Sequence, residues 1–261
     1  MSKKFFYLIL LLIIVLFLIF FGYLAINKKI KDQQQKIANE PAQLEAVELV
    51  DKSCDNCFDP SYLFNVLKEQ NVVFKRIRQV DINSEEGKSL KEQYKVSKIP
   101  IVFITGEIKK NTAFLNLFQG YGEVKDDVLI SDVYPPYKDL TKNEMIGLVD
   151  LTIIYDATCT ECYNTKKHLD FLKAEGINPV STKKLDVAEE EAQQLITKYN
   201  ITKVPTIILS PAAKNYKIFT EHWQEVGIIA DNGYYIYTAP EKIGTYKDLA
   251  TNEIKKVQIN N

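Results

Sequence analysis

The sequence predicts an α/β protein of two tandem domains, each a central mixed sheet flanked by helices, behind an N-terminal transmembrane helix. Three observations lead to this prediction. One short pattern occurs twice in the same register, strand-like and helix-like segments alternate around both copies, and residues 5–26 carry no charge. The predicted parts are the anchor at 1–26, a polar stalk at 27–44, and domains at 45–145 and 146–261.

The anchor is predicted from the run FFYLILLLIIVLFLIFFGYLAI at residues 5–26. As a helix, this run reaches about 33 Å, which matches the roughly 30 Å hydrocarbon core of a bilayer. A cleavable signal peptide is an alternative, but its apolar part is shorter and is followed by small residues, whereas this run is followed by Asn27, Lys28 and Lys29. We expect a retained single-pass anchor; a buried core helix is the remaining alternative.

Composition limits the possible partners and the compartment. The 261 residues carry a formal net charge of −1 and are 46% hydrophobic, which is ordinary for globular domains. Basic residues are spread along the chain, so nucleic acid is not an expected partner. Two lysines before the apolar run and three after it nearly balance, so charge alone does not orient the anchor. The paired cysteines favour soluble domains outside the cytosol, where such pairs cycle or stay oxidised.

The repeated pattern is a C-x-x-C pair followed, 46 residues after its first cysteine, by a proline that opens an apolar run. Its members are Cys54, Cys57 and Pro100 in the first copy and Cys159, Cys162 and Pro205 in the second. Equivalent residues are 105 positions apart, and twelve of the fifty positions are identical between 51–100 and 156–205. A lone C-x-x-C is only moderately specific, but two in register indicate a duplicated dithiol domain.

Hydrophobic periodicity assigns the elements of each copy in order. The first copy is predicted as a strand at 46–50, the Cys pair, a helix at 61–70, a strand at 72–82, a helix at 84–94 and strands at 99–105 and 114–118. The second copy is predicted as 151–155, the Cys pair, 163–174, 180–187, 189–199, 205–209 and 216–219. The matching tails YKDL at 137–140 and 246–249 are expected to form added hairpins.

A C-x-x-C pair at a strand-to-helix junction brings two thiols to the positive end of a helix dipole, which lowers the pKa of the first thiol. The thiolate attacks a disulfide, and the second cysteine resolves the mixed disulfide. Cys54 and Cys159 are the expected nucleophiles, and Cys57 and Cys162 the expected resolving residues. This chemistry requires no bound cofactor and no metal.

With this spacing and element order, residues 46–118 and 151–223 resemble the thioredoxin superfamily. In that superfamily the proline before the third strand is cis, touches the dithiol and leaves the preceding backbone free to pair with a substrate polypeptide. The resemblance implies that Pro100 and Pro205 are cis and that Ile99 and Val204 pair with substrate. The sequence departs from the family in lacking the tryptophan before the first cysteine and the Gly-Pro between the cysteines, which leaves the redox poise open.

Four other residues stand out beside the cysteines: Glu48, two histidines and the single tryptophan. Thioredoxins keep a buried acid six residues before the first cysteine; this chain has Glu48 there in one copy and Ile153 in the other, and we expect Glu48 to be an exposed strand residue. The two histidines, His168 and His222, are expected at the surface. Trp223 is expected in the core.

The sequence therefore predicts a membrane-anchored, extracytoplasmic thiol–disulfide oxidoreductase that acts on protein substrates and exchanges electrons with an unidentified redox partner. The second pair is expected to be the more reactive, because its helix can run unbroken from residue 163, whereas Pro60 delays the first helix. The alternative is a non-enzymatic tethered interaction module. In it, the cysteines form structural disulfides or together hold zinc.

Overall fold

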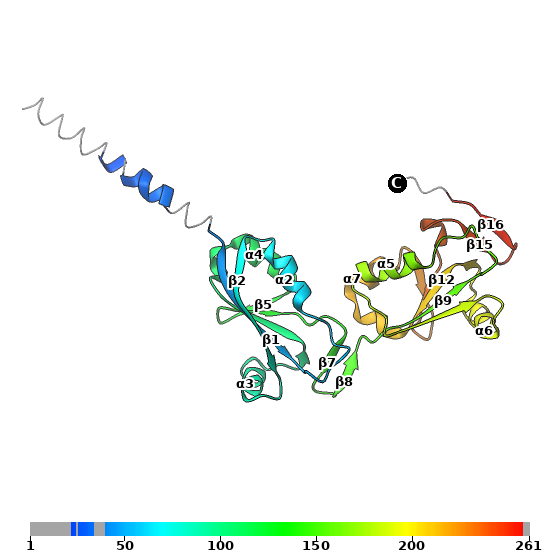
Figure 1. Ribbon diagram of the computed structural model, residues 1–261, viewed down its shortest axis with the longest axis horizontal. Coiled ribbons are helices and arrows are strands. Elements are labelled where there is room, and N and C mark those ends of the chain that lie inside the picture. Colours follow the sequence, from blue (N-terminus) through cyan, green and yellow to red (C-terminus); the bar gives the residue numbers. More distant parts are fainter. Residues whose placement is uncertain (1–21, 25, 34–39, 258–261) are drawn as a thin grey trace, which may run out of the picture. The chain divides into compact units, whose positions relative to one another are not determined.

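The computed structural model describes residues 22–24, 26–33 and 40–257, in which two copies of one α/β arrangement follow each other along the chain (Figure 1). Residues 22–24 and 26–33 are helical. Within these described ranges, no helix is both long and apolar enough to cross a membrane. The span predicted at 5–26 lies almost wholly outside the described residues, so the anchor stays a prediction.

The contacts divide the chain into two compact units that do not coincide with the two copies. The first unit takes in the residues up to Glu48, Pro60–Gln79 and Val102–Asp132. The second takes in Leu49–Asp59, Val80–Ile101 and Val133–Asn261. The first Cys pair and its proline thus belong to the second unit. The predicted boundary between residues 145 and 146 stays a prediction.

The first copy contains a five-stranded sheet in the order β2-β1-β4-β6-β5. Its strands are β1 (Ala42–Val50), β2 (Val72–Asp81), β4 (Ile101–Gly106), β5 (Gly122–Lys125) and β6 (Val128–Ser131). Its helices are α2 (Ser61–Lys68), α3 (Glu85–Tyr94), α4 (Thr112–Phe118) and a 3-10 turn at Ile108–Lys110. A separate three-stranded sheet joins β3 (Lys98–Ile99) to the hairpin of β7 (Tyr137–Asp139) and β8 (Glu144–Ile146).

The second copy repeats this plan with a sheet in the order β10-β9-β12-β14-β13, in which β10 is parallel to β9 and β12 is antiparallel to it. Its strands are β9 (Asp150–Tyr155), β10 (Ser181–Asp186), β12 (Thr206–Leu209), β13 (Gly227–Ile229) and β14 (Tyr235–Tyr237). Its helices are α5 (Lys166–Ala174), α6 (Glu190–Tyr199), α7 (Lys217–Trp223) and 3-10 turns at Pro211–Asn215 and Pro240–Lys242. The small sheet contains β11 (Lys203–Val204), β15 (Tyr246–Asp248) and β16 (Glu253–Lys255).

The predicted β-α-β-α-β order and both tail hairpins are confirmed, but one element of each copy is wrong. Residues 114–118 and 216–219 are predicted as strands, but 114–118 lies in α4, and 217–219 forms the start of α7 with Tyr216 at its N-cap. Phe114 and Phe118 are four residues apart and both are fully buried, as are Phe219 and Trp223. This spacing is helical, and the side chain of Asn111 caps α4 by accepting from the Phe114 N–H.

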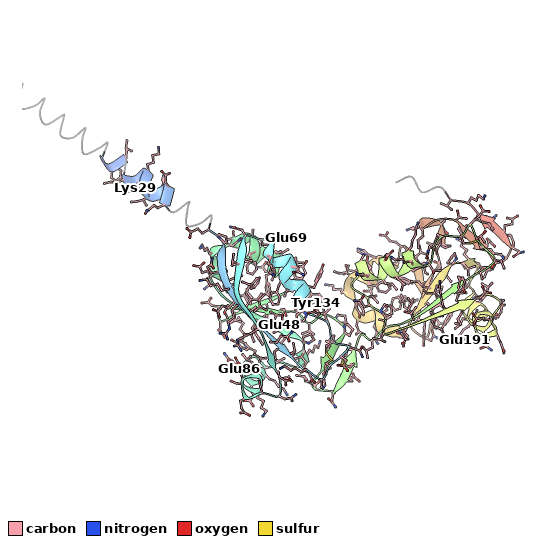
Figure 2. All side chains as sticks on the ribbon, in the orientation of Figure 1. Lys29, Glu48, Glu69, Glu86, Tyr134 and Glu191 are labelled. Atoms are coloured by element: carbon pink, nitrogen blue, oxygen red, sulfur yellow. A yellow bond between two sulfur atoms is a disulfide. The ribbon has the colours of Figure 1, made fainter. Side chains whose placement is uncertain are left out.

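The helices α3 and α6 begin with matching acidic first turns. Figure 2 labels Glu86 and Glu191, which lie in these first turns, where a negative charge complements the helix dipole. Ser84 adds a side-chain cap to α3, accepting from the Gly87 N–H at 3.0 Å. The first turns therefore follow from local sequence alone.

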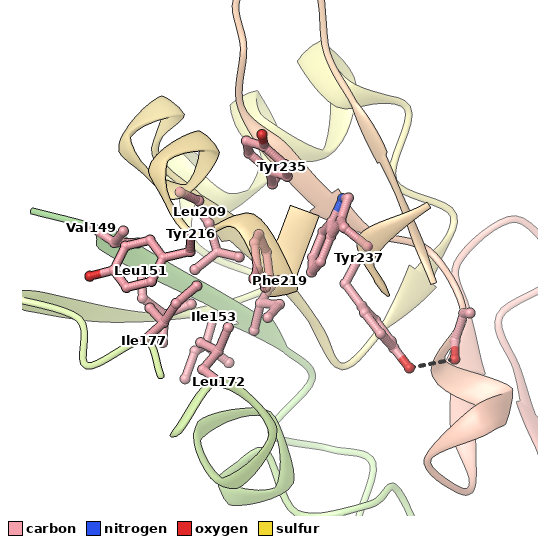
Figure 3. Close-up of a cluster of buried hydrophobic side chains, with 14 residues drawn as sticks. Val149, Leu151, Ile153, Leu172, Ile177, Leu209, Tyr216, Phe219, Tyr235 and Tyr237 are labelled. Atoms are coloured by element: carbon pink, nitrogen blue, oxygen red, sulfur yellow. Dashed lines mark hydrogen bonds between the residues drawn. The ribbon is translucent and has the colours of Figure 1, made fainter. Parts of the chain in front are cut away.

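In the second copy, alternate residues of the strands face opposite layers. Leu151 and Ile153 of β9 pack with α5 and α7, whereas Ile154 packs with α6. Figure 3 shows the larger of these clusters, in which rings of α7 and β14 fill the space over the sheet. Trp223, expected in the core, is fully buried there. The sheet thus holds the end of β9, where the Cys loop begins, between two packed layers.

Candidate dithiol sites

Each C-x-x-C pair forms a disulfide in a loop between a strand and a helix. Cys54–Cys57 follows β1 with an S–S distance of 2.00 Å, and Cys159–Cys162 follows β9 at 2.04 Å. Cys54, Cys57 and Cys162 are half-buried, whereas Cys159 is 8% exposed. Burial does not single out the first cysteine of each pair as the more open, so the assignment of Cys54 and Cys159 as nucleophiles stays a prediction.

Both Cys loops end before their helix begins. The helix α2 starts at Ser61, after Pro60, as expected, but α5 starts at Lys166 and not at residue 163. The chain after Cys162 is held in another direction, because the Tyr163 N–H donates to the Thr245 carbonyl and Asn164 Oδ1 accepts from the Lys166 N–H. The predicted unbroken helix from residue 163 is therefore wrong, and it no longer supports a greater reactivity of the second Cys pair.

The aspartate that opens each loop organises it through hydrogen bonds. In the first copy, Asp51 Oδ1 accepts from the backbone N–H and the hydroxyl of Ser53 at 2.9 and 2.5 Å, and the Asp51 carbonyl accepts from the Cys54 N–H. In the second copy, Asp156 accepts in the same way from Thr158 at 2.8 and 2.5 Å. Each first cysteine is thus held three residues beyond an anchored carboxylate.

A lysine from the hairpin binds the other oxygen of each aspartate. Lys138 Nζ lies 2.7 Å from Asp51 Oδ2, and Lys247 Nζ lies 2.5 Å from Asp156 Oδ2. The hydrogen bonds from Lys138 and Ser53 lower the pKa of Asp51 to about 2. Burial acts to raise the pKa of Asp156, but the hydrogen bonds from Lys247 and Thr158 hold it below its usual value. Both ion pairs therefore persist near neutral pH.

The proline turns lie where the resemblance implied. The Ile99–Pro100 and Val204–Pro205 bonds are cis, as is Pro135–Pro136, which was not expected. Cys57 Sγ lies 4.0 Å from the Ile99 carbonyl oxygen, so the turn adjoins the first disulfide.

The residues predicted to pair with substrate are paired with the chain itself. Ile99 is opposite Lys138 in an antiparallel ladder, Val204 is opposite Lys247, and both predicted residues are fully buried. The hairpin thus covers the backbone edge that the family leaves free. Substrate pairing at Ile99 and Val204 stays a prediction.

The hairpin also brings different side chains to the two sites. Met145 of β8 is opposite Lys138, and its sulfur lies 3.5 Å from Cys54 Sγ. The same place in the second hairpin, opposite Lys247, holds Ile254. The first disulfide therefore has a thioether at its Cys54 end. Sequence reasoning missed it because Met145 lies 91 residues away from that cysteine.

Two residues expected at the surface are buried. Glu48 is 4% exposed and belongs to the alternate set of β1 residues that packs with α2 and α4. Its counterpart Ile153 faces the equivalent layer of the second copy. His168 is fully buried in α5. The internal repeat predicts the burial of His168, because the equivalent residue of the first copy is the core residue Leu63. His222 is exposed beside Glu175, as expected.

Among residues 22–24, 26–33 and 40–257, no group of three or more His, Cys, Asp or Glu side chains is placed to hold a metal ion.

Comparisons with known proteins identify no family. The chain matches no protein-family model and no curated protein. Among solved structures, it is similar to the NTD_N/C domain of alkylhydroperoxide reductase AhpF from Enterococcus faecalis, with 15% identity over 69% of this chain and 89% of that one and a TM-score of 0.20. For ERdj5, identity is 10% over 85% of this chain and 26% of that one, with a TM-score of 0.20. These TM-scores are too low to support an argument about fold or function.

Proposed function

We propose that the chain is a membrane-anchored thiol–disulfide oxidoreductase that exchanges disulfides with protein substrates outside the cytosol. The observation that carries this proposal occurs in both copies: each holds a disulfide at the same strand-to-helix junction, followed at the same spacing by an X-Pro turn. The exchange needs no bound cofactor, because the two sulfurs carry both electrons.

The proposed reaction is two successive thiolate attacks. In the reduced protein, the Cys54 thiolate attacks one sulfur of a substrate disulfide, forms a mixed disulfide and releases one substrate thiolate, which takes up a proton. The Cys57 thiolate then attacks the Cys54 sulfur, so the protein disulfide forms and the second substrate thiol leaves. Two electrons pass to the substrate, and a redox partner of unknown identity restores them. Cys159 and Cys162 act in the same way.

The ion pair beside each loop supports this chemistry. The ionised Asp51 lies three residues before Cys54, and its negative charge alone would disfavour a thiolate there. Lys138 neutralises that charge at 2.7 Å, and Lys247 does the same for Asp156. The hairpin therefore keeps the loop ordered without adding net negative charge near the sulfurs.

Substrate access follows from the hairpin ladder. For Ile99 or Val204 to pair with a substrate backbone, β7 or β15 must leave the edge it occupies. A substrate that reaches only the sulfurs needs no such movement. We propose that the sulfurs react first and that backbone pairing requires release of the hairpin.

The covered edge also favours a second candidate. A tethered interaction module with static disulfides agrees with the hairpins that lie on both proline turns and with the burial of Cys159. In that case the disulfides staple each loop and do not cycle. The oxidoreductase is expected to reduce disulfide substrates catalytically, whereas the static module is not.

Turnover of a disulfide-containing peptide by the full chain in detergent, with dithiothreitol as electron donor, tests the proposal. We expect catalysis that is lost, by at least 100-fold, in the Cys54→Ser/Cys159→Ser double variant. The same rate in both proteins would support the static module instead. A thiol titration with and without a chelator accompanies it, and reversible reduction with no metal release agrees with the exchange mechanism.

The location is proposed from the uncharged run at residues 5–26 and from the paired cysteines. The uncharged run supports a retained anchor, and the paired cysteines support an extracytoplasmic site. Mass analysis of the membrane fraction is expected to find the intact N-terminus. A mature chain that begins near Lys28 in the soluble extracytoplasmic fraction would contradict the anchor.

A further inference from the structure

A buried polar cluster lies behind the second Cys pair. Tyr163 directly follows Cys162, and its hydroxyl lies 2.7 Å from the carbonyl oxygen of Pro205 and 2.9 Å from Nε2 of His168. The imidazole is fully buried and lies edge-on to the rings of Tyr163 and Tyr237, with centroids 5.5 and 4.9 Å away. One side chain thus links the Cys loop to the proline turn on the other side of the site.

Hydrogen-bond chemistry assigns the protons. A carbonyl can only accept, so the single hydroxyl proton of Tyr163 goes to Pro205, and the hydroxyl must accept from Nε2–H of His168. The remaining ring nitrogen, Nδ1, is then unprotonated, and it is buried with no hydrogen-bond partner in the described part of the chain. Buried polar atoms without partners are rare and require an explanation. Packing alone would be better served by a leucine, as at the equivalent Leu63.

Burial keeps both groups neutral. It lowers the pKa of His168 to about 4 and raises the pKa of Tyr163 far above its usual value. The titratable groups that face the imidazole are the hydroxyls of Tyr163 and Tyr237, and Glu241 acts on both phenols at longer range. The link to Pro205 is therefore complete at neutral pH.

The first copy lacks this link while keeping the backbone around it. Phe58 stands in place of Tyr163 and Leu63 in place of His168. The backbone N–H of Phe58 donates to the Pro136 carbonyl at 2.6 Å, just as that of Tyr163 donates to Thr245 at 2.9 Å. The hydroxyl and the imidazole are thus additions to a loop that is built without them in the other copy.

We propose that Tyr163 and His168 are positioning residues of the second dithiol site, which fix the Pro205 turn relative to Cys162 for polypeptide substrates. This inference rests on the proposed function. A polypeptide that exchanges disulfides contacts the walls of the site, whereas a small thiol requires only the sulfurs. The link therefore affects the binding of peptides and not the exchange with small reagents.

The test uses the full chain with the first pair disabled by Cys54→Ser and Cys57→Ser. In this background, Tyr163→Phe is expected to raise the KM for a disulfide peptide at least fivefold, with kcat and the rate of reduction by dithiothreitol changed less than twofold. Tyr237→Phe is the matched control, because its hydroxyl donates to the Ala239 carbonyl instead, and its KM is expected to stay within twofold.

Two outcomes would overturn the inference: an unchanged KM in Tyr163→Phe, or an equal loss with peptide and with dithiothreitol, which indicates general damage. If the parent background turns over no peptide while it is still reduced by dithiothreitol, the proposed function of this pair fails instead.

A spectroscopic measurement on the unaltered chain gives an independent answer. The sequence has only two histidines, so nitrogen NMR of the imidazoles is simple to interpret. We expect His168 as the Nε2–H tautomer, neutral at pH 5.5, and a loss of that fixed tautomer in Tyr163→Phe. His222 serves as the exposed reference. An Nδ1–H tautomer of His168 would refute the proton assignment and the link with it.

Discussion

The two copies support the same loop with different cores. Helices α4 and α7 occupy equivalent places, yet α4 contributes Phe118 where α7 contributes Trp223, whose indole N–H donates to the Ile228 carbonyl. On the sheet, Leu129 of β6 corresponds to Tyr235 of β14. At these two positions the first copy has hydrocarbon side chains, whereas the second copy has polar groups that must be paired. The two copies thus have the same helix positions and strand register although their core residues differ in polarity.

What does not differ is the set of aspartate, hydroxyl and lysine residues that holds each Cys loop. In both copies the loop aspartate accepts from the hydroxyl residue two positions later and from a hairpin lysine, and that lysine is opposite the residue before the proline. The core residues thus differ between the copies, whereas the Cys loop, the proline turn and the hairpin keep the same contacts in both. If this contrast is correct, changes to the shared contacts should affect both copies, and changes to the differing residues should affect only one.

The largest effect is expected from Lys138→Met and Lys247→Met. Each leaves a buried carboxylate without its cation, which costs about 3 kcal/mol of unfolding free energy for a pair broken from one side. Lys247 is expected to matter more, because its side chain is 16% exposed against 27% for Lys138. Urea denaturation measures the loss, and reduction of the adjacent disulfide by dithiothreitol is expected to accelerate. Lys142→Met is the control, since its partner Glu144 is exposed.

If only one of the two lysine variants loses stability, the aspartate–lysine pair does not stabilise both copies. That result would contradict the claim that the two copies share this unit.

Acid is expected to weaken the second copy through His168. Burial lowers its pKa from 6.5 to about 4, so the unfolded chain binds the proton more readily between these values. The stability contributed by neutral His168 is complete above about pH 6.5 and is lost as pH falls toward 4, by about 2 kcal/mol between pH 7.5 and pH 5. Urea denaturation at both pH values checks this. His168→Leu should remove this part of the pH dependence, and an unchanged dependence would contradict the assignment.

Gly87 of α3 corresponds to Ala192 of α6, and exchanging these two residue types is expected to have a smaller effect on the free energy of unfolding. A Cβ on Gly87 would lie 2.1 Å from the Asp81 carbonyl oxygen, so the backbone must shift. Gly87→Ala is expected to cost about 1 to 2 kcal/mol, since overpacking outweighs the better helix propensity of alanine. Ala192→Gly, the reverse change, is expected to cost about 1 kcal/mol through helix propensity. Thermal denaturation compares them, and a more stable Gly87→Ala would show that α3 and α6 approach their sheets alike.

Sequence patterns predicted the elements whose signals are local. The helices α3 and α6, the strands of the β-α-β-α-β order and the paired YKDL tails are confirmed. The strands predicted at 114–118 and 216–219 are wrong because a short apolar run suits a strand or a helix equally, although the four-residue spacing from Phe114 to Phe118 favours a helix. Local signals thus place elements but do not arbitrate short apolar runs.

The site was harder to predict because its contacts join distant residues. The pairing of Asp51 with Lys138 spans 87 residues, and no local pattern indicates it. Nor does any local pattern show that the hairpin lies on Ile99. His168 was missed because histidine is usually exposed. Alignment of the two copies, which places it against Leu63, gives the better prediction.

The central claim is that the two Cys pairs exchange disulfides with polypeptides, and trapping the covalent intermediate tests it most directly. Cys57→Ser and Cys162→Ser each remove one resolving thiol, so a disulfide peptide should remain attached to the neighbouring cysteine. Mass spectrometry of the reduced full chain after addition of the peptide is expected to find the adduct on Cys54 in the first variant and on Cys159 in the second. The absence of any adduct on both cysteines, in protein whose thiols titrate as free, would contradict the account.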